Sequence, residues 1–148
     1  KAASNPENLE IIVVDAGSSD GTLDSIDDSV KNFCEPQFAL RKYESLNFGI
    51  AKSSGEIILF LDADTYLPSG FDSSILKALK RNNVVGGAFE FAFQKPDWKL
   101  KLLTLVNQVR YRIDRAYYGD QALFAKTSTL RSIGGVPEEP LMEAAFLS

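Results

Sequence analysis

One short segment places the strongest constraint on how this chain folds. Residues 57–61 (Ile-Ile-Leu-Phe-Leu) form an uninterrupted apolar run, and two carboxylates follow it at Asp62 and Asp64. An apolar run of this length, bounded by turn residues, is typical of a strand that helices cover on both faces. Open α/β sheets bind their ligands at the carboxyl ends of such strands, which is where these acids lie. The segment therefore predicts an α/β sheet with a site at the end of this strand.

The two acids also indicate what the site binds. Two ionised carboxylates side by side at the end of a buried strand are costly unless a cation accompanies them. Carboxylate oxygens suit Mn²⁺ and Mg²⁺, and proteins usually share these ions with substrate phosphates. We therefore expect Asp62 and Asp64 to hold Mn²⁺ or Mg²⁺ and, through it, a phosphorylated ligand. The alternative is that the pair only caps the turn that follows.

A second predicted strand ends in the same way. Residues 9–14 are rich in β-branched side chains, and Asp15 follows them. The small polar loop 16–22 comes next, in which Gly17 and Asp20 suit a tight turn and a helix cap. Alternatively, Asp15 lies near the same crevice and accepts hydrogen bonds from a nucleoside. The loop has neither Gly-Lys-Ser/Thr nor Gly-x-Gly-x-x-Gly, so no phosphate-binding loop and no Rossmann dinucleotide site is predicted.

Strand and helix patterns alternate along the chain. This alternation predicts one domain, residues 1–148, with a three-layer, mostly parallel α/β sheet and right-handed crossovers. We expect further strands at residues 37–43, 84–93 and 122–125, and helices at about 20–32, 46–54, 69–81, 96–117 and 127–133, with another beginning at 141.

The composition excludes several classes of protein. The chain has no histidine, which excludes histidine metal sites, Ser-His-Asp triads and Cys-His dyads. Cys34 is its single cysteine, so we expect no internal disulfide and a reducing, cytoplasmic compartment. A net charge of −4 argues against a nucleic-acid partner. No apolar run reaches the roughly 18 residues that a membrane span needs.

Taken in order, the motifs resemble a known family. Residues 10–22 and 55–68 resemble the nucleotide-binding segment and the Asp-x-Asp strand of family-two glycosyltransferases of the GT-A fold. Residues 119–124, 133–137 and 140–143 resemble a bacterial subgroup of these enzymes. The resemblance implies metal-dependent, inverting transfer of a sugar from a nucleotide-sugar donor to an acceptor hydroxyl. The acceptor would be a glycan, a lipid or a small molecule, and the enzyme could form an oligomer.

The resemblance also implies roles for individual residues. Asp15 would contact the nucleoside, Asp62 the ribose, and Asp64 the metal that bridges the two phosphates. Glu143 would be the base that deprotonates the acceptor. The full set expected to bind the donor comprises Asp15, Gly17, Asp20, Asn47, Asp62, Asp64, Gly119, Asp120 and Gln121.

The long predicted helix allows a further contact. Trp98, Leu102 and Leu105 lie along its apolar stripe and are expected in the core. If they are exposed instead, they would make a peripheral contact with the cytoplasmic face of a membrane.

The sequence departs from the family pattern at both ends. The family opens with a strand carrying a Pro-x-x-Asn-Glu-like segment, which is absent here, so we expect the domain to lack its first strand and to be incomplete at both termini. The subgroup continues Met-Glu-Asp, whereas Ala144 follows Glu143 here. Two alternatives therefore stay open. One is a domain that binds nucleotide-sugar without turnover, and the other is a nucleotidyltransferase, which would need a glycine-rich basic loop that we do not find.

Overall fold

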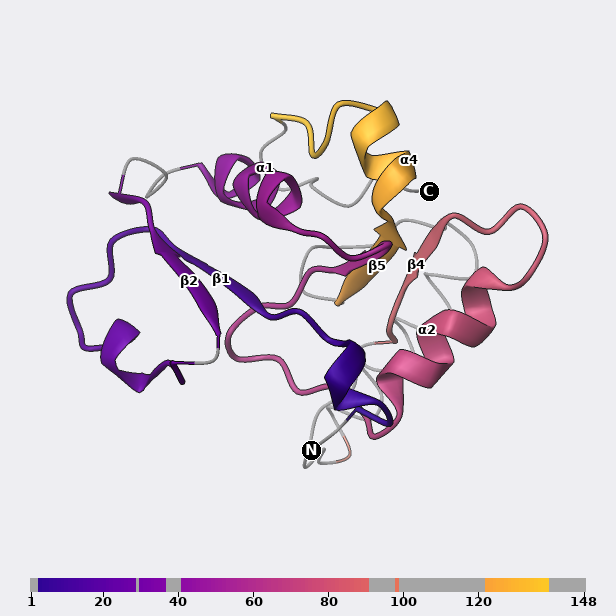
Figure 1. The fold of residues 1–148 in the computed structure, drawn as a ribbon, viewed down its shortest axis with the longest axis horizontal. Helices are drawn as coiled ribbons and strands as arrows, with labels where there is room; N and C mark the ends of the chain where they lie inside the picture. Colours follow the sequence, from indigo (N-terminus) through magenta and orange to yellow (C-terminus); the bar gives the residue numbers. More distant parts are fainter. Residues whose placement is uncertain (1–2, 29, 37–40, 91–97, 99–121, 139–148) are drawn as a thin grey trace.

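The described strands form two small sheets. The computed structural model describes residues 3–28, 30–36, 41–90, 98 and 122–138. In the first sheet, β1 (Ile12–Asp15) pairs in parallel with β2 (Lys31–Cys34) (Figure 1). In the second, the order is β3–β5–β4, and both pairings are antiparallel. These strands are β3 (Ile57–Leu59), β4 (Gly86–Ala88) and β5 (Leu123–Lys126).

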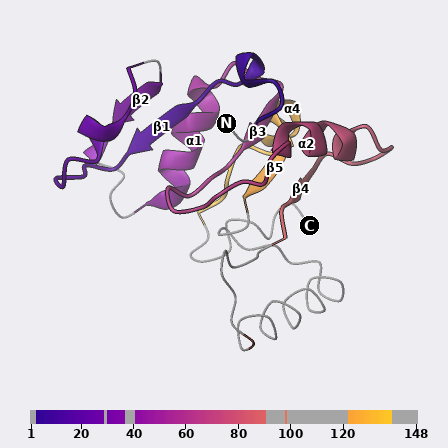
Figure 2. The same ribbon diagram turned by 90° about the horizontal axis from the view of Figure 1, so that it is seen from below.

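Three α-helices in the described residues cover these strands. They are α1 (Lys42–Lys52), α2 (Phe71–Leu79) and α4 (Thr127–Ser132), and two short 3₁₀ turns, η1 (Pro6–Asn8) and η2 (Leu23–Ser25), complete the regular structure. Helix α1 packs on β1 and against α4, while α2 lies on the opposite side of β5 (Figures 1 and 2). Among the described helices, none is long and apolar enough to cross a membrane.

Strand β3 divides its side chains between two cores. Ile58 packs in a cluster with Ile50 of α1 and Leu130 of α4. Its neighbour Ile57 packs in the other cluster, with Phe71 of α2. Because successive side chains of a strand point to opposite faces, this alternation makes β3 the middle of three layers. The predictions of an α/β domain, of three layers and of a strand covered on both faces are confirmed.

The direction of strand pairing corrects one expectation. We predicted a mostly parallel sheet, but in the described residues only β1 and β2 pair in parallel. Strand β5 enters between β3 and β4 and runs antiparallel to both. Gly86 and Gly87 permit the close approach, since a Cβ at Gly86 would lie 2.7 Å from the carbonyl oxygen of Phe124.

The helix predicted at 20–32 is also wrong. The turn η2 occupies Leu23–Ser25, and Lys31–Cys34 forms β2. Residues 24–28 are rich in Asp and Ser, which favour caps and turns over helix interiors. Phe33 on β2 packs edge-on against Phe48 of α1, with ring centroids 5.3 Å apart. This long-range contact stabilises the segment as a strand.

The strand predicted at 37–43 is wrong in its last residues, because 42 and 43 belong to α1, whereas the other described elements lie close to their predicted positions. Helix α1 begins at Lys42, four residues before the predicted start, and Arg41 and Glu44 form an ion pair of 2.7 Å across its first turn. Residues 37–40, 91–97, 99–121 and 139–148 lie outside the described residues, and with them most of the helix predicted at 96–117. The core position expected for Trp98 is wrong, since 71% of this residue is exposed.

Two carboxylates tie distant parts of the fold together. Glu10, just before β1, accepts hydrogen bonds from Lys31 Nζ at 2.6 Å and from the backbone N–H of Ser54 at 2.7 Å. Asp72, in the first turn of α2, accepts bonds from the backbone N–H groups of Ser4 and Asn5, each at 2.9 Å. Both contacts join segments that are far apart in sequence.

The Glu10 contacts lead to a prediction about acid stability. The hydrogen bonds from Lys31 and from Ser54 lower the pKa of Glu10 from 4.5 to about 2. Because the folded-state pKa is the lower one, the stabilisation is complete above pH 4.5 and is lost as the pH falls toward 2. Urea denaturation should show Glu10→Gln less stable than the wild type at pH 7, by roughly 1 kcal/mol after allowance for screening. The difference should shrink at pH 3, and an equal difference at both pH values would contradict it.

Candidate functional site

The candidate site lies where β1 and β3 end. The chain leaves both strands on the same side of the molecule (Figures 1 and 2). Asp15 is the last residue of β1, and Asp62 follows β3 by three residues. Residues 62–65 form a turn in which the N–H of Thr65 donates to the carbonyl oxygen of Asp62 at 3.0 Å. Asp15 and Asp62 thus both lie at carboxyl ends of strands, in two different sheets, and their gathering around one ligand stays a prediction.

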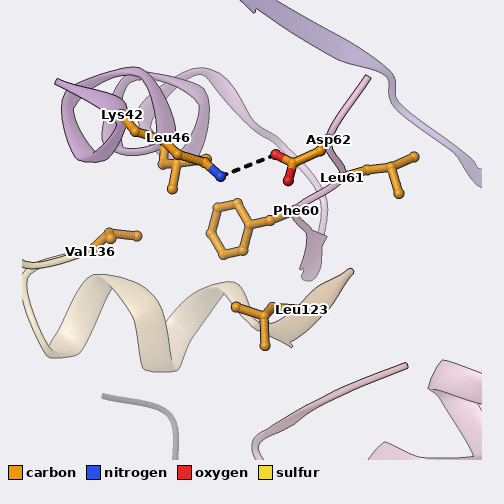
Figure 3. Close-up of a pocket in the computed structure, with 7 residues that line it drawn as sticks. All are labelled: Lys42, Leu46, Phe60, Leu61, Asp62, Leu123 and Val136. Atoms are coloured by element: carbon orange, nitrogen blue, oxygen red, sulfur yellow. Dashed lines mark ion pairs between the residues drawn. The ribbon is translucent and has the colours of Figure 1, made fainter. Parts of the chain in front are cut away.

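Asp62 borders a small hollow and forms an ion pair there. Its Oδ1 lies 3.2 Å from Nζ of Lys42, the first residue of α1 (Figure 3). Their side chains are 37% and 46% exposed, so water reaches both charges. The hollow has a volume of about 30 Å³, far below the several hundred that a bound nucleotide fills, so the described hollow alone is no donor pocket. It is lined by Lys42, Leu46, Phe60, Leu61, Asp62, Leu123 and Val136.

The donor set at this strand end fits a hard divalent cation. Asp64 is exposed in the turn and Asp62 is half-buried, so both offer carboxylate oxygens to solvent. Among the described residues, no group of three or more His, Cys, Asp or Glu side chains gathers around a common point. Two carboxylates leave most coordination positions to other oxygens, which is typical of Mg²⁺ or Mn²⁺ bound with substrate phosphates. Lys42 supplies a positive charge beside Asp62.

Asp15 forms hydrogen bonds with the loop that follows it. It is 7% exposed, and its Oδ2 accepts hydrogen bonds from the N–H groups of Gly17 and Ser18, each at 2.8 Å. The Ser18 hydroxyl donates to Oδ1 at 2.5 Å, and these contacts hold the pKa of Asp15 below its usual value. Gly17 has φ +94°, a conformation that favours glycine. The loop geometry is consistent with the turn interpretation, and nucleoside contact by Asp15 stays a prediction.

Asp20 and Asn47 also have partners within the protein. Asp20 accepts hydrogen bonds from the hydroxyl of Thr22 at 2.5 Å and from its N–H at 3.1 Å, and the Thr22 contacts lower its pKa. Both ends of the Asn47 amide bond the backbone of Val136. Their predicted roles in donor binding are untested, and the contacts seen are structural.

The structure adds one residue, Lys42, to the candidate site, and it does not describe four of the predicted site residues. No sequence pattern marked Lys42, because a lone lysine at the start of a helix is ordinary, and only the fold brings it to Asp62. Four predicted residues lie outside the described part of the chain: Gly119, Asp120, Gln121 and Glu143.

A known protein family matches most of this chain. The model of glycosyl transferase family 2 matches residues 1–133. A poly-beta-1,6-N-acetyl-D-glucosamine synthase of Staphylococcus epidermidis is 35% identical over 81 residues, which cover 52% of this chain and 20% of that protein. A GalNAc(5)-diNAcBac-PP-undecaprenol beta-1,3-glucosyltransferase of Campylobacter jejuni is 36% identical over 77 residues, covering 48% and 25%.

A third relative matches over a longer stretch. An uncharacterized glycosyltransferase of Haemophilus influenzae is 28% identical over 112 residues, which are 71% of this chain and 44% of that protein. The matched segments thus span between a fifth and less than half of the lengths of these relatives.

Proposed function

Because this chain belongs to glycosyl transferase family 2, we propose that it binds a nucleotide-sugar and transfers the sugar to an acceptor hydroxyl with inversion. The observation that carries the proposal is the pair Asp62 and Asp64 after β3, with the ammonium group of Lys42 in an ion pair with Asp62. A diphosphate needs positive charge and a metal needs oxygen ligands, and this strand end offers both.

Both negatively and positively charged side chains would hold the donor. Asp64 and Asp62 would hold Mn²⁺ or Mg²⁺, which when bound neutralises charge on the diphosphate leaving group. Lys42 would exchange part of its ion pair with Asp62 for contact with a phosphate oxygen. Its pairing with Asp62 keeps the lysine at this strand end before the donor arrives, so little side-chain entropy is lost on binding.

The loop after β1 would contact the nucleoside. Asp15 stabilises the start of this loop by accepting hydrogen bonds from Gly17 and Ser18. A loop ordered in advance presents its backbone and side chains to a base without a further ordering cost. Because the Asp15 carboxylate is ionised and still has acceptor capacity at Oδ1, it can also accept a bond from a base or ribose.

The acceptor is proposed by class from the relatives. One relative is named for a polymer of N-acetylglucosamine and another for a glycan carried on a lipid diphosphate. We therefore propose a glycan or a lipid-linked saccharide as the acceptor. Glu143 is the proposed base that takes the proton from the attacking hydroxyl, which lies on the sugar face opposite the leaving group in an inverting reaction.

The proposal is tested with a panel of donors. UDP-, GDP- and dTDP-sugars are incubated with the chain and Mn²⁺, and both calorimetric binding and release of nucleoside diphosphate are measured. We expect the sugars of one nucleotide class to bind only when the metal is present. We also expect slow release of nucleoside diphosphate from that donor, with water as the acceptor. Binding without release would support a domain that binds donor without turnover, and no binding of any donor would contradict the proposal.

A further inference from the structure

One side chain ties the segment after α4 to α1. The Nδ2 of Asn47 donates to the carbonyl oxygen of Val136 at 2.8 Å, and the N–H of Val136 donates to Oδ1 of Asn47 at 2.7 Å. Val136 is 3% exposed, so water cannot readily replace these bonds. We call this pair of hydrogen bonds the Asn47 bracket. It satisfies both backbone polar groups of a buried residue, as a neighbouring strand would.

The Asn47 bracket connects two walls of the hollow beside Asp62. Lys42 and Leu46 form one wall and come from α1, the helix that carries Asn47. Val136 lies on the far side of the hollow from Asp62 (Figure 3). Since Asn47 joins α1 to Val136, it fixes the separation of the two walls. Tyr43, one helical turn earlier on α1, packs against the same buried cluster as Val136.

The chain before Val136 is shaped to make the bracket possible. The N–H of Gly135 bonds the carbonyl of Leu130 at 2.8 Å, and that of Gly134 bonds Arg131 at 3.3 Å, which together form a Schellman motif that ends α4. Both glycines have positive φ, +84° and +88°. A Cβ at Gly135 would overlap Oδ1 of Asn47, whereas one at Gly134 would meet open space. Gly135 therefore makes room for the Asn47 amide.

We propose that Asn47 is a positioning residue, which holds Val136 against α1 and so sets the wall of the hollow that faces Asp62 and Lys42. The inference rests on the proposed function, and it gives Asn47 a different role from direct donor contact. The amide has used one donor and its acceptor on Val136, so it acts on the reaction through the shape of the site.

The test separates geometry from donor affinity. The assay uses Mn²⁺ and the donor that binds in the panel described under the proposed function. In this assay Asn47→Ala should lower the maximal rate of nucleoside diphosphate release about tenfold or more. The donor KM should change less than about threefold, since Lys42, Asp62 and Asp64 remain. Asn47→Asp should recover rate as the pH falls, because the protonated carboxyl again donates to the Val136 carbonyl, whereas Asn47→Ala should not.

Two control variants exclude general destabilisation. Asp72→Asn weakens the contact of α2 with Ser4 and Asn5, and Asn82→Ala removes an exposed asparagine amide. Both should release nucleoside diphosphate at the wild-type rate when folded at the assay temperature. If Asn47→Ala does not fold, the pH profile of Asn47→Asp alone decides.

The outcomes are distinct for the two proposals. A folded Asn47→Ala chain that works at the wild-type rate, or an Asn47→Asp chain with the wild-type pH profile, overturns the positioning role alone. A large rise in donor KM at unchanged maximal rate also overturns it, in favour of direct donor contact. A wild-type chain that releases nothing from any donor contradicts the proposed function and removes the inference with it.

Discussion

Asp64→Ala is expected to abolish metal-dependent binding of the nucleotide-sugar while leaving the fold intact. Asp64 is exposed in the turn after β3, so its loss opens no cavity. It is the carboxylate of the pair that has no ion pair among the described residues, and it is therefore the freer ligand for Mn²⁺. We expect the calorimetric Kd for donor with Mn²⁺ to rise by at least about 100-fold, equivalent to ~2.7 kcal/mol.

The matched control is another exposed aspartate. Asp28→Ala removes the same charge away from the strand end and should bind donor as the wild type does. Asp62→Asn should have an intermediate effect, because Lys42 then loses its partner and becomes available to the diphosphate. Unchanged affinity of Asp64→Ala for donor with Mn²⁺ would refute the assignment of the metal site, whatever the activity of the chain.

Gly135→Ala should destabilise the fold far more than Gly134→Ala, although the two glycines are adjacent and share a positive φ. Alanine at either position costs about 1 kcal/mol for the left-handed backbone. At Gly135 the new Cβ also displaces the Asn47 amide, which breaks two hydrogen bonds to buried Val136 and adds about 2 kcal/mol. Chemical denaturation should therefore give losses near 1 and ~3 kcal/mol.

A double-mutant cycle identifies the source of the difference. In an Asn47→Ala background, Gly135→Ala no longer meets an amide and should cost only about as much as Gly134→Ala. Gly134→Ala, which meets open space, should cost the same in both backgrounds. If the cost of Gly135→Ala is unchanged by removal of Asn47, the bracket does not explain this glycine.

The part of the candidate site that lies on and after β3 was predictable from the sequence. Residues 57–61 predicted β3, its two covered faces and the acids at its end, because both the pattern and the chemistry lie within one segment. The pairing of β5 between β3 and β4 was not predictable in this way. It depends on contacts between segments more than thirty residues apart, and no local pattern records the direction of pairing.

Two contacts near the site depend on residues far apart in the sequence. Donor binding by Asn47 stays a prediction, and its bond to the backbone of Val136, 89 residues later, could not be predicted because a backbone group leaves no mark in the sequence. Lys42 was overlooked for the converse reason, since its significance comes only from Asp62 on another element. The turns at Asp15 and Asp20 were predictable because their shortest hydrogen bonds go to partners within three residues.

The position of β5 has a consequence for the order in which the chain can fold during synthesis. Strand β3 leaves the ribosome more than sixty residues before its hydrogen-bonding partner β5. Until then the apolar side chains on both its faces have only partial cover, since Phe124 and Leu130 complete the two clusters. Non-local pairings of this kind fold slowly and expose surfaces that aggregate. A nascent chain halted before residue 123 would therefore be a natural client for a chaperone that recognises extended apolar segments.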